Sequence, residues 1–144
     1  GINSRMDGLQ AAILGVKLPH LKTWTAQRRK NAALYNEALN GITQLITPTE
    51  RPNTQHSYHL YVIRCEDRDA LKEYLQENGI ETAIHYPTPL PLLPAYQKQG
   101  YDESAYPVSE KVSKEILSLP MYPELSQAQI ETIAQTIKAF YARA

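Results

Sequence analysis

The sequence predicts an α+β fold in which a short, few-stranded sheet is covered by helices and preceded by a long, kinked helical segment. Two observations carry this prediction. Residues 7–40 place apolar side chains at helical spacing, and farther along the chain short runs of β-forming residues alternate with amphipathic stretches. The expected order is helix, helix, strand, helix, strand, helix, strand, helix.

The first expected elements are two consecutive helices within residues 7–40. Their apolar positions recur one helical turn apart: Leu9, Ala12, Ile13 and Val16, then Leu21, Trp24, Tyr35 and Leu39. Pro19 lacks a backbone donor and disfavours helical geometry at Leu18, so a break or kink is expected there. Gly41 is expected to close the second helix.

The middle of the chain predicts strands around one helix. Residues 42–57 form an extended connector with a short strand near Leu45 and Ile46, and HLYVIRC (59–65) alternates as a strand does. Asp67 is expected to cap a helix that runs to about Asn78 and ends at Gly79. IETAIHY (80–86) is expected to form the next strand.

The C-terminal third predicts two helices and a strand between them. Val108, Val112 and Ile116 mark a helix, and LSLPM (117–121) a short strand. Ser126 and Gln129 form a capping box at the start of the last helix. The apolar residues of that helix are Ile130, Ile133, Ile137 and Tyr141.

Composition excludes several classes of protein. The chain has 144 residues, 42% of them apolar, which suits one domain with a core. Fifteen basic residues balance fifteen acidic ones, so a nucleic-acid partner is not expected. Cys65 is the single cysteine, which rules out an intrachain disulfide and favours the cytoplasm. The apolar runs are too short to cross a membrane.

Three polar groups invite a functional interpretation but have a structural one that we favour. His56 and His59, with His85, suggest a metal site, yet residues three apart on an extended segment point to opposite faces. Residues 66–69 mix both charge signs at a strand-to-helix turn and indicate a solvated cap. Residues 28–30 (Arg-Arg-Lys) indicate a solvent-facing side of a helix.

Two further polar clusters are open to either interpretation. Asn3, Ser4 and Arg5 directly precede a helix, where backbone donors and a guanidinium suit a phosphate; the alternative is helix capping. His85 and Tyr86 end an expected strand and are followed by four prolines in AIHYPTPLPLLPAY (83–96). The alternative there is a strand end with ordinary core aromatics, which the residues alone favour.

Three stretches, in order, resemble a known family. GINSRMDGLQAAILGVKLPHL, GIETAIHYPTPL and LSLPMYPELS are similar to segments of the DegT/DnrJ/EryC1/StrS aminotransferases, pyridoxal-phosphate (PLP) enzymes that make amino sugars. The resemblance covers the whole chain. It implies the small C-terminal domain of a fold type I PLP aminotransferase, with residues 1–41 linking the large domain to a small α+β domain at 42–144.

The resemblance also implies roles for individual residues. Asn3 and Arg5 match residues that complete the PLP site of a neighbouring subunit in a homodimer, and His85 and Tyr86 match residues near the nucleotide-sugar substrate. Many relatives have a histidine where this chain has Pro91, so a substrate contact made by that histidine is not carried over.

The resemblance places the catalytic centre outside this chain. Transamination needs a lysine that holds PLP as a Schiff base, and none of the eight lysines stands in the family's motif. We therefore name no catalytic residue, and expect a part of a longer enzyme that is inactive alone and moves an amino group from glutamate to a nucleotide-linked keto-sugar. The start at Gly1, without Met, agrees with this expectation. The alternative is a stand-alone regulatory or interaction domain derived from the same fold.

Overall fold

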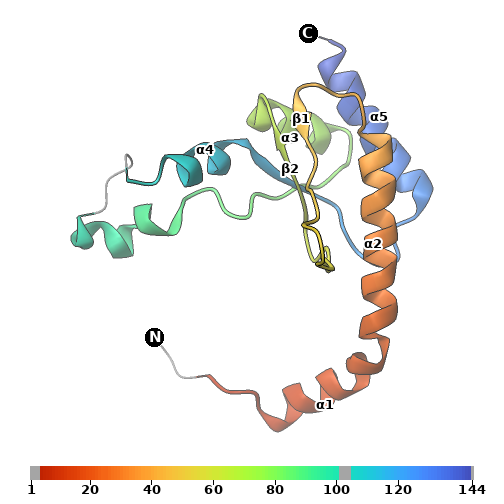
Figure 1. Ribbon diagram of the computed structural model, residues 1–144, viewed down its shortest axis with the longest axis vertical. Helices are drawn as coiled ribbons and strands as arrows, with labels where there is room; N and C mark the ends of the chain where they lie inside the picture. Colours follow the sequence, from red (N-terminus) through yellow and green to blue (C-terminus); the bar gives the residue numbers. More distant parts are fainter. Residues whose placement is uncertain (1–3, 101–104, 144) are drawn as a thin grey trace.

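The computed structural model describes residues 4–100 and 105–143 and has the expected α+β architecture (Figure 1). Its helices are α1 (Gly8–Lys17), α2 (Leu21–Ala38), α3 (Arg68–Glu77), α4 (Pro107–Glu115) and α5 (Gln127–Tyr141). Short 3-10 helices are η1 (Leu18–His20), η2 (Leu90–Leu92) and η3 (Pro94–Gln99). The strands are β1 (Leu45–Ile46), β2 (Tyr61–Cys65) and β3 (Ile116–Leu119).

The three strands form one antiparallel sheet with β2 in the centre. Tyr61 pairs with Leu119, and Val62 pairs with Ser118. Because side chains alternate along a strand, the sheet has two distinct faces. Tyr61, Leu119 and their same-face neighbours form the core face. Val62 and Ser118 lie on the second face, which leads to the candidate site below.

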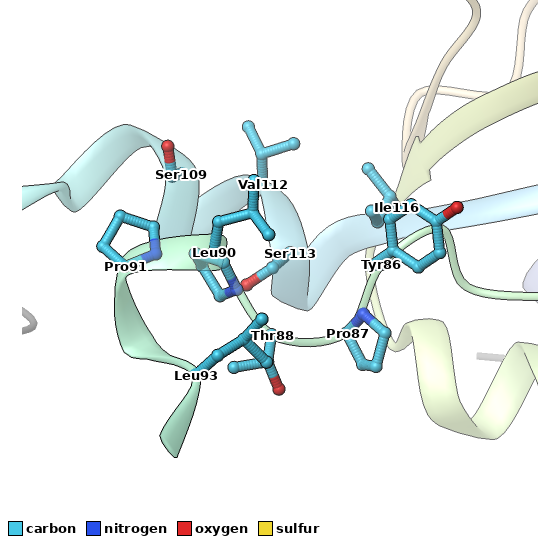
Figure 2. Close-up of a pocket in the computed structure, with 11 residues that line it drawn as sticks. Tyr86, Pro87, Thr88, Leu90, Pro91, Leu93, Ser109, Val112, Ser113 and Ile116 are labelled. Atoms are coloured by element: carbon cyan, nitrogen blue, oxygen red, sulfur yellow. The ribbon is translucent and has the colours of Figure 1, made fainter. Parts of the chain in front are cut away.

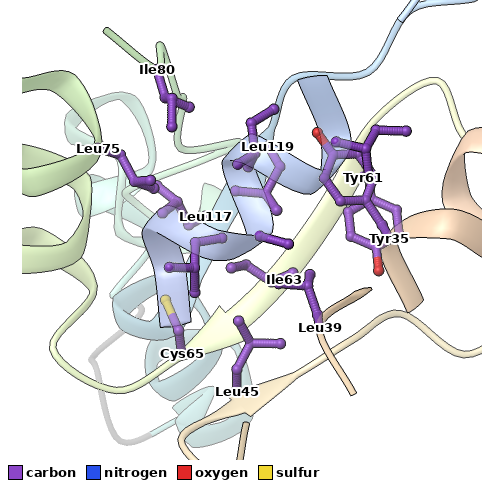
Figure 3. Close-up of a cluster of buried hydrophobic side chains, with 14 of the residues drawn as sticks. Tyr35, Leu39, Leu45, Tyr61, Ile63, Cys65, Leu75, Ile80, Leu117 and Leu119 are labelled. Atoms are coloured by element: carbon purple, nitrogen blue, oxygen red, sulfur yellow. The ribbon is translucent and has the colours of Figure 1, made fainter. Parts of the chain in front are cut away.

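The core lies between the core face of the sheet and helices α2, α3 and α5 (Figure 3). Tyr35 of α2 stacks on Tyr61 of β2 with ring centroids 4.7 Å apart. Both buried hydroxyls are satisfied, since Tyr35 donates to the carbonyl of Pro120 at 2.9 Å and Tyr61 donates to Asn36 at 2.6 Å. Fully buried side chains around this pair are Leu39, Ile63, Leu71, Leu75, Leu117, Ile130 and Ile137.

The N-terminal segment bends at Pro19 as predicted, and its first helix packs on nothing in the described structure. The 3-10 turn η1 separates α1 from α2. Asp7 caps α1 through a capping box with Gln10, yet α1 contains no buried residue. Leu9 and Val16 are each 73% exposed. Figure 1 shows α1 reaching away from the sheet, while the C-terminal half of α2 packs along α5.

The prediction of a strand at 80–86 is wrong. Only Ala83 pairs with the sheet, through two backbone hydrogen bonds with Ser118, at 3.2 Å from its own N–H and 2.7 Å to its carbonyl. Pairing ends because the opposing positions offer no free backbone groups. Pro120, which would oppose Glu81, has no N–H. Ile116, which would oppose His85, donates its N–H to the carbonyl of Val112, and its own carbonyl accepts from Arg68. The chain leaves the sheet at this point and turns toward α4.

Two helix boundaries also differ from the prediction. Asp67 is the residue before α3, but it has φ 48° and its side chain makes no capping hydrogen bond. Capping through the side chain normally requires extended backbone at that position, which explains the difference. The helix expected through Ile116 ends at Glu115, because Ile116 is extended and pairs with Arg64 of β2. The other caps, Ser126 with Gln129 and the turn at Gly79, are confirmed.

Two arginines that the sequence assigned to solvent are held by the fold. Arg29 donates to both carboxylate oxygens of Glu50, at 2.6 and 3.2 Å, and to the carbonyl of His56 at 3.0 Å. Arg68 has a side chain only 11% exposed and donates to the carbonyls of Ser113 and Ile116. Both partners are distant in sequence, which explains why local charge patterns did not indicate them.

A candidate substrate site beside His85 and Tyr86

An apolar cavity of about 680 Å³ lies between the proline-rich segment and α4 (Figure 2). One wall is formed by residues 86–93, with Leu90 and Leu93 facing the cavity, and the other by Val112 of α4 and Ile116 of β3. Ser109 and Ser113 supply polar groups on the α4 side. An apolar cavity with a few polar groups at its edge is the usual form of a small-molecule site.

His85 and Tyr86 stand where the segment leaves the sheet for this cavity. His85 is half-buried, and its Nδ1 lies 2.9 Å from the hydroxyl oxygen of Ser118. The next side chain, Tyr86, is 74% exposed and lines the cavity. The two rings meet edge to face with centroids 5.5 Å apart. The pair therefore places the aromatic ring of Tyr86 at the cavity and an imidazole held by Ser118 next to it.

Ser118 is a site residue that the sequence did not indicate. It lies on the second face of the sheet, 4% exposed, beside Ile116 of the cavity wall. Its only sequence signal is a hydroxyl between two leucines in LSLP, a buried polar residue that needs a partner. The partner is 33 residues away, so the pairing depends on the fold.

The proline-rich segment forms a tight turn in the cavity wall. Residues 90–92 form the 3-10 turn η2, in which Leu92 donates to the carbonyl of Pro89 at 2.9 Å. Pro91 lies on this turn and lines the cavity. His85 is held by hydrogen bonding to Ser118 rather than by the prolines that follow it.

The predicted cluster of Asn3, Ser4 and Arg5 has no described contact with His85 or Tyr86. Asn3 lies outside the described residues. Arg5 is exposed, in the irregular segment that leads into α1. The contacts given for His85 are with Ser118 and Tyr86, and none joins it to Arg5 among the described residues.

The described lysines do not fit a covalently held PLP. A lysine that forms a Schiff base with PLP stands in an enclosed site, where burial or a nearby cation lowers its pKa. Among lysines whose side chains are described, six are exposed, Lys72 is half-buried, and none lines the cavity beside Tyr86. Lys111 and Lys114 face Glu115 and Glu110 on the surface of α4.

Other reactive groups have structural roles. Burial raises the pKa of the Cys65 thiol to about 11, so this thiol is protonated at neutral pH and is not a nucleophile. His56 accepts a hydrogen bond from the backbone N–H of Tyr58 at 2.8 Å, and no group of three metal-binding side chains occurs in the part of the chain that is described.

None of the described helices has the length and apolar character needed to cross a membrane.

Comparison with known proteins identifies the family. The model of the DegT/DnrJ/EryC1/StrS aminotransferase family matches residues 1–138. The chain belongs to this family. Aminotransferases of the DegT/DnrJ/EryC1/StrS family are PLP-dependent.

The similar proteins described below are much longer than this chain. A pleiotropic regulatory protein of Geobacillus stearothermophilus is 47% identical over 98% of this chain, and a dTDP-3-amino-3,4,6-trideoxy-alpha-D-glucose transaminase of Streptomyces venezuelae is 36% identical over 99%. The crystal structure of S. venezuelae DesV in complex with a ketimine intermediate matches with a TM-score of 0.93 and 36% identity, over 100% of this chain and 39% of that one. The chain spans 38% of the length of both curated relatives.

Proposed function

We propose that this chain is the small-domain part of a sugar aminotransferase, which as a whole moves an amino group from glutamate to a nucleotide-linked keto-sugar. Residues 1–41 link the two domains and residues 42–144 form the small domain. The observation that carries the proposal is the family match over residues 1–138. The chain also has little more than a third of the length of the two curated relatives.

The uncovered face of α1 supports this proposal. Leu9, Ile13 and Val16 recur on one side of the helix and are 53–73% exposed. An apolar stripe on a helix normally packs on a partner. We propose that the partner is the cofactor domain, meaning the part of the relatives that this chain does not span. The lysine that holds PLP lies there.

Asn3 and Arg5 are proposed to act toward the cofactor of a neighbouring subunit. Arg5 is exposed in the segment just before α1, and a guanidinium is a strong partner for phosphate. In a homodimer these residues complete the partner's phosphate site. In the longer protein, Asn3→Ala should weaken retention of PLP more than binding of the nucleotide sugar. Equal PLP retention in wild type and variant would contradict the assignment.

His85 and Tyr86 are proposed to enclose the sugar. An aromatic ring packs against the apolar face of a sugar, and an imidazole nitrogen binds a hydroxyl or phosphate oxygen. Tyr86 at the cavity edge and half-buried His85 beside it supply both groups. The base of the nucleotide and the carbon that is aminated depend on the cofactor domain as well.

The coding sequence upstream of Gly1 and a PLP titration test the proposal together. A reading frame that continues into a lysine-bearing domain is expected. The chain by itself should take up no PLP that survives borohydride reduction and denaturation. A start codon at Gly1, or stoichiometric covalent uptake by this chain, would contradict the proposal.

A second candidate function is a non-catalytic regulatory or interaction module on the same fold. The observation that favours it is the name of the 47% identical relative, a pleiotropic regulatory protein. Equal numbers of acidic and basic residues count against a form of this module that binds nucleic acid. The same upstream reading frame separates the two candidates, because a regulatory module needs no lysine-bearing domain.

A further inference from the structure

We infer that Ser118 is a positioning residue, which fixes His85 so that Nε2 presents an N–H donor to an oxygen atom of the ligand. Three hydrogen bonds join Ser118 to residues 83–85: two through its backbone to Ala83, and the contact between its hydroxyl and His85 Nδ1 at 2.9 Å. Ser118 thus holds both the backbone that carries His85 and the imidazole ring itself.

The direction of the hydroxyl hydrogen bond follows from the surroundings of Ser118. The side chain is buried, and Nδ1 of His85 is the only acceptor for its hydroxyl among the described residues. If Nδ1 instead carried the proton and donated, the buried Ser118 hydroxyl proton would have no acceptor, which is unfavourable. Ser118 therefore donates, and neutral His85 carries its proton on Nε2.

The free nitrogen is the one available to a ligand. The two ring nitrogens lie on different edges of the imidazole, so Nε2 is turned away from Ser118. Nε2 has no hydrogen-bond partner within the described residues, and His85 is only half-buried beside the cavity wall at Tyr86. An N–H donor selects an oxygen acceptor, such as a hydroxyl or phosphate oxygen. That the oxygen belongs to a nucleotide sugar rests on the proposed function.

Nitrogen-15 NMR of the ligand-free chain tests this inference. Spectra are recorded at about pH 8.5, well above the ordinary imidazole pKa of ~6.5, and the His85 signals are assigned by their loss in His85→Gln. In wild type, Nδ1 should resonate as an unprotonated ring nitrogen and Nε2 as an N–H. In Ser118→Ala the two shifts should move toward each other, because both tautomers become populated. Ser118→Thr, which keeps the hydroxyl, should restore the wild-type pattern.

Ser109→Ala is the matched control, because it removes a hydroxyl from the same cavity without touching His85. Its His85 shifts should equal those of wild type. A protonated Nδ1 in wild type, or unchanged shifts in Ser118→Ala, would overturn the inference. The wild-type measurement decides the proton's position even if a variant folds poorly. Because no ligand is present, a negative result would leave the proposed aminotransferase role intact, and that role is tested separately.

Discussion

Tyr35 shows how a single buried hydroxyl contributes to the core. The residue is fully buried, stacks on Tyr61 and donates to the carbonyl of Pro120. Tyr35→Phe keeps the ring but leaves that carbonyl without its donor, so we expect the free energy of unfolding to fall by about 1 kcal/mol in urea denaturation. Tyr86→Phe is the matched control, since its exposed side chain has no hydrogen bond in the described structure. Equal losses in both variants would contradict the expectation.

Glu50 gives the fold a pH dependence on the acid side. A hydrogen bond from Arg29 and a second from the backbone N–H of His56 lower the pKa of Glu50. Because the folded pKa lies below the unfolded value of ~4.3, the stabilisation is present above that value and is lost as the pH falls through the folded pKa.

The comparison of wild type with Glu50→Gln measures this effect. The gap between their urea midpoints should be constant near neutral pH and shrink below about pH 4.3, as the wild-type carboxylate takes up its proton. Two midpoint curves that stay parallel down to the acid limit would show that Glu50 contributes nothing through its charge.

At the site, the sequence named His85 and Tyr86 as candidates but did not indicate Ser118, which hydrogen-bonds to His85. The family resemblance singled out the aromatic pair, since the residues alone favoured a strand end with ordinary core aromatics. Ser118 did not stand out, because its importance comes from a hydrogen bond across 33 residues and its neighbours Leu117 and Leu119 indicate an ordinary strand. A local sequence motif can therefore name candidate site residues. The contact that orients His85 depends on the pairing of Ser118 with Ala83, which a local motif does not show.

Two capping boxes with the same geometry should differ in their effect on stability. Ser126 caps α5, which buries Ile130, Ile133 and Ile137, while Asp7 caps α1, which buries nothing. Ser126→Ala should lower the free energy of unfolding by about 1 kcal/mol. Asp7→Ala should leave it unchanged and instead speed amide exchange within residues 8–17, because α1 frays without unfolding the core. A similar loss in both variants would mean that α1 is part of the cooperative unit.

Helices and strands were predicted best where the pattern of apolar residues continued over several turns or several alternations. Helices α2, α3 and α5 and strand β2 each have a sustained pattern and were found close to their true positions. Alternation in IETAIHY favours a strand at 80–86, yet only Ala83 pairs with the sheet. The residues that would pair beside it have no free backbone groups, because Pro120 has no N–H and Ile116 is bonded to Val112 and Arg68. Whether an alternating segment forms a strand therefore depends on the free backbone groups of the strand beside it, which the local sequence does not show.

At the scale of the whole molecule, the exposed face of α1 should make the isolated chain associate. Leu9 and Ile13 expose apolar surface that packs on nothing in the described structure. We expect a molecular mass that rises with concentration in analytical ultracentrifugation, and a monomer when both residues are changed to glutamate.

The control for this association is Lys22→Glu, which gives the same change in net charge at an exposed position of α2. It should still associate, and neither variant should lower the free energy of unfolding. A wild-type chain that is monomeric at all concentrations would contradict the assignment of α1 as a docking helix.

The most direct test of the account is amino transfer by the protein translated from the complete reading frame that contains this chain. The purified protein is given PLP, glutamate and a dTDP- or UDP-linked 3-keto-sugar, and the aminated sugar is detected by mass spectrometry. We expect glutamate-dependent amination, with kcat/KM about tenfold lower or more in His85→Ala, since a hydrogen bond to the substrate is lost. Glu73→Ala, on the exposed side of α3, should match wild type. Absence of amination with every such sugar, or full activity in His85→Ala, would contradict the account.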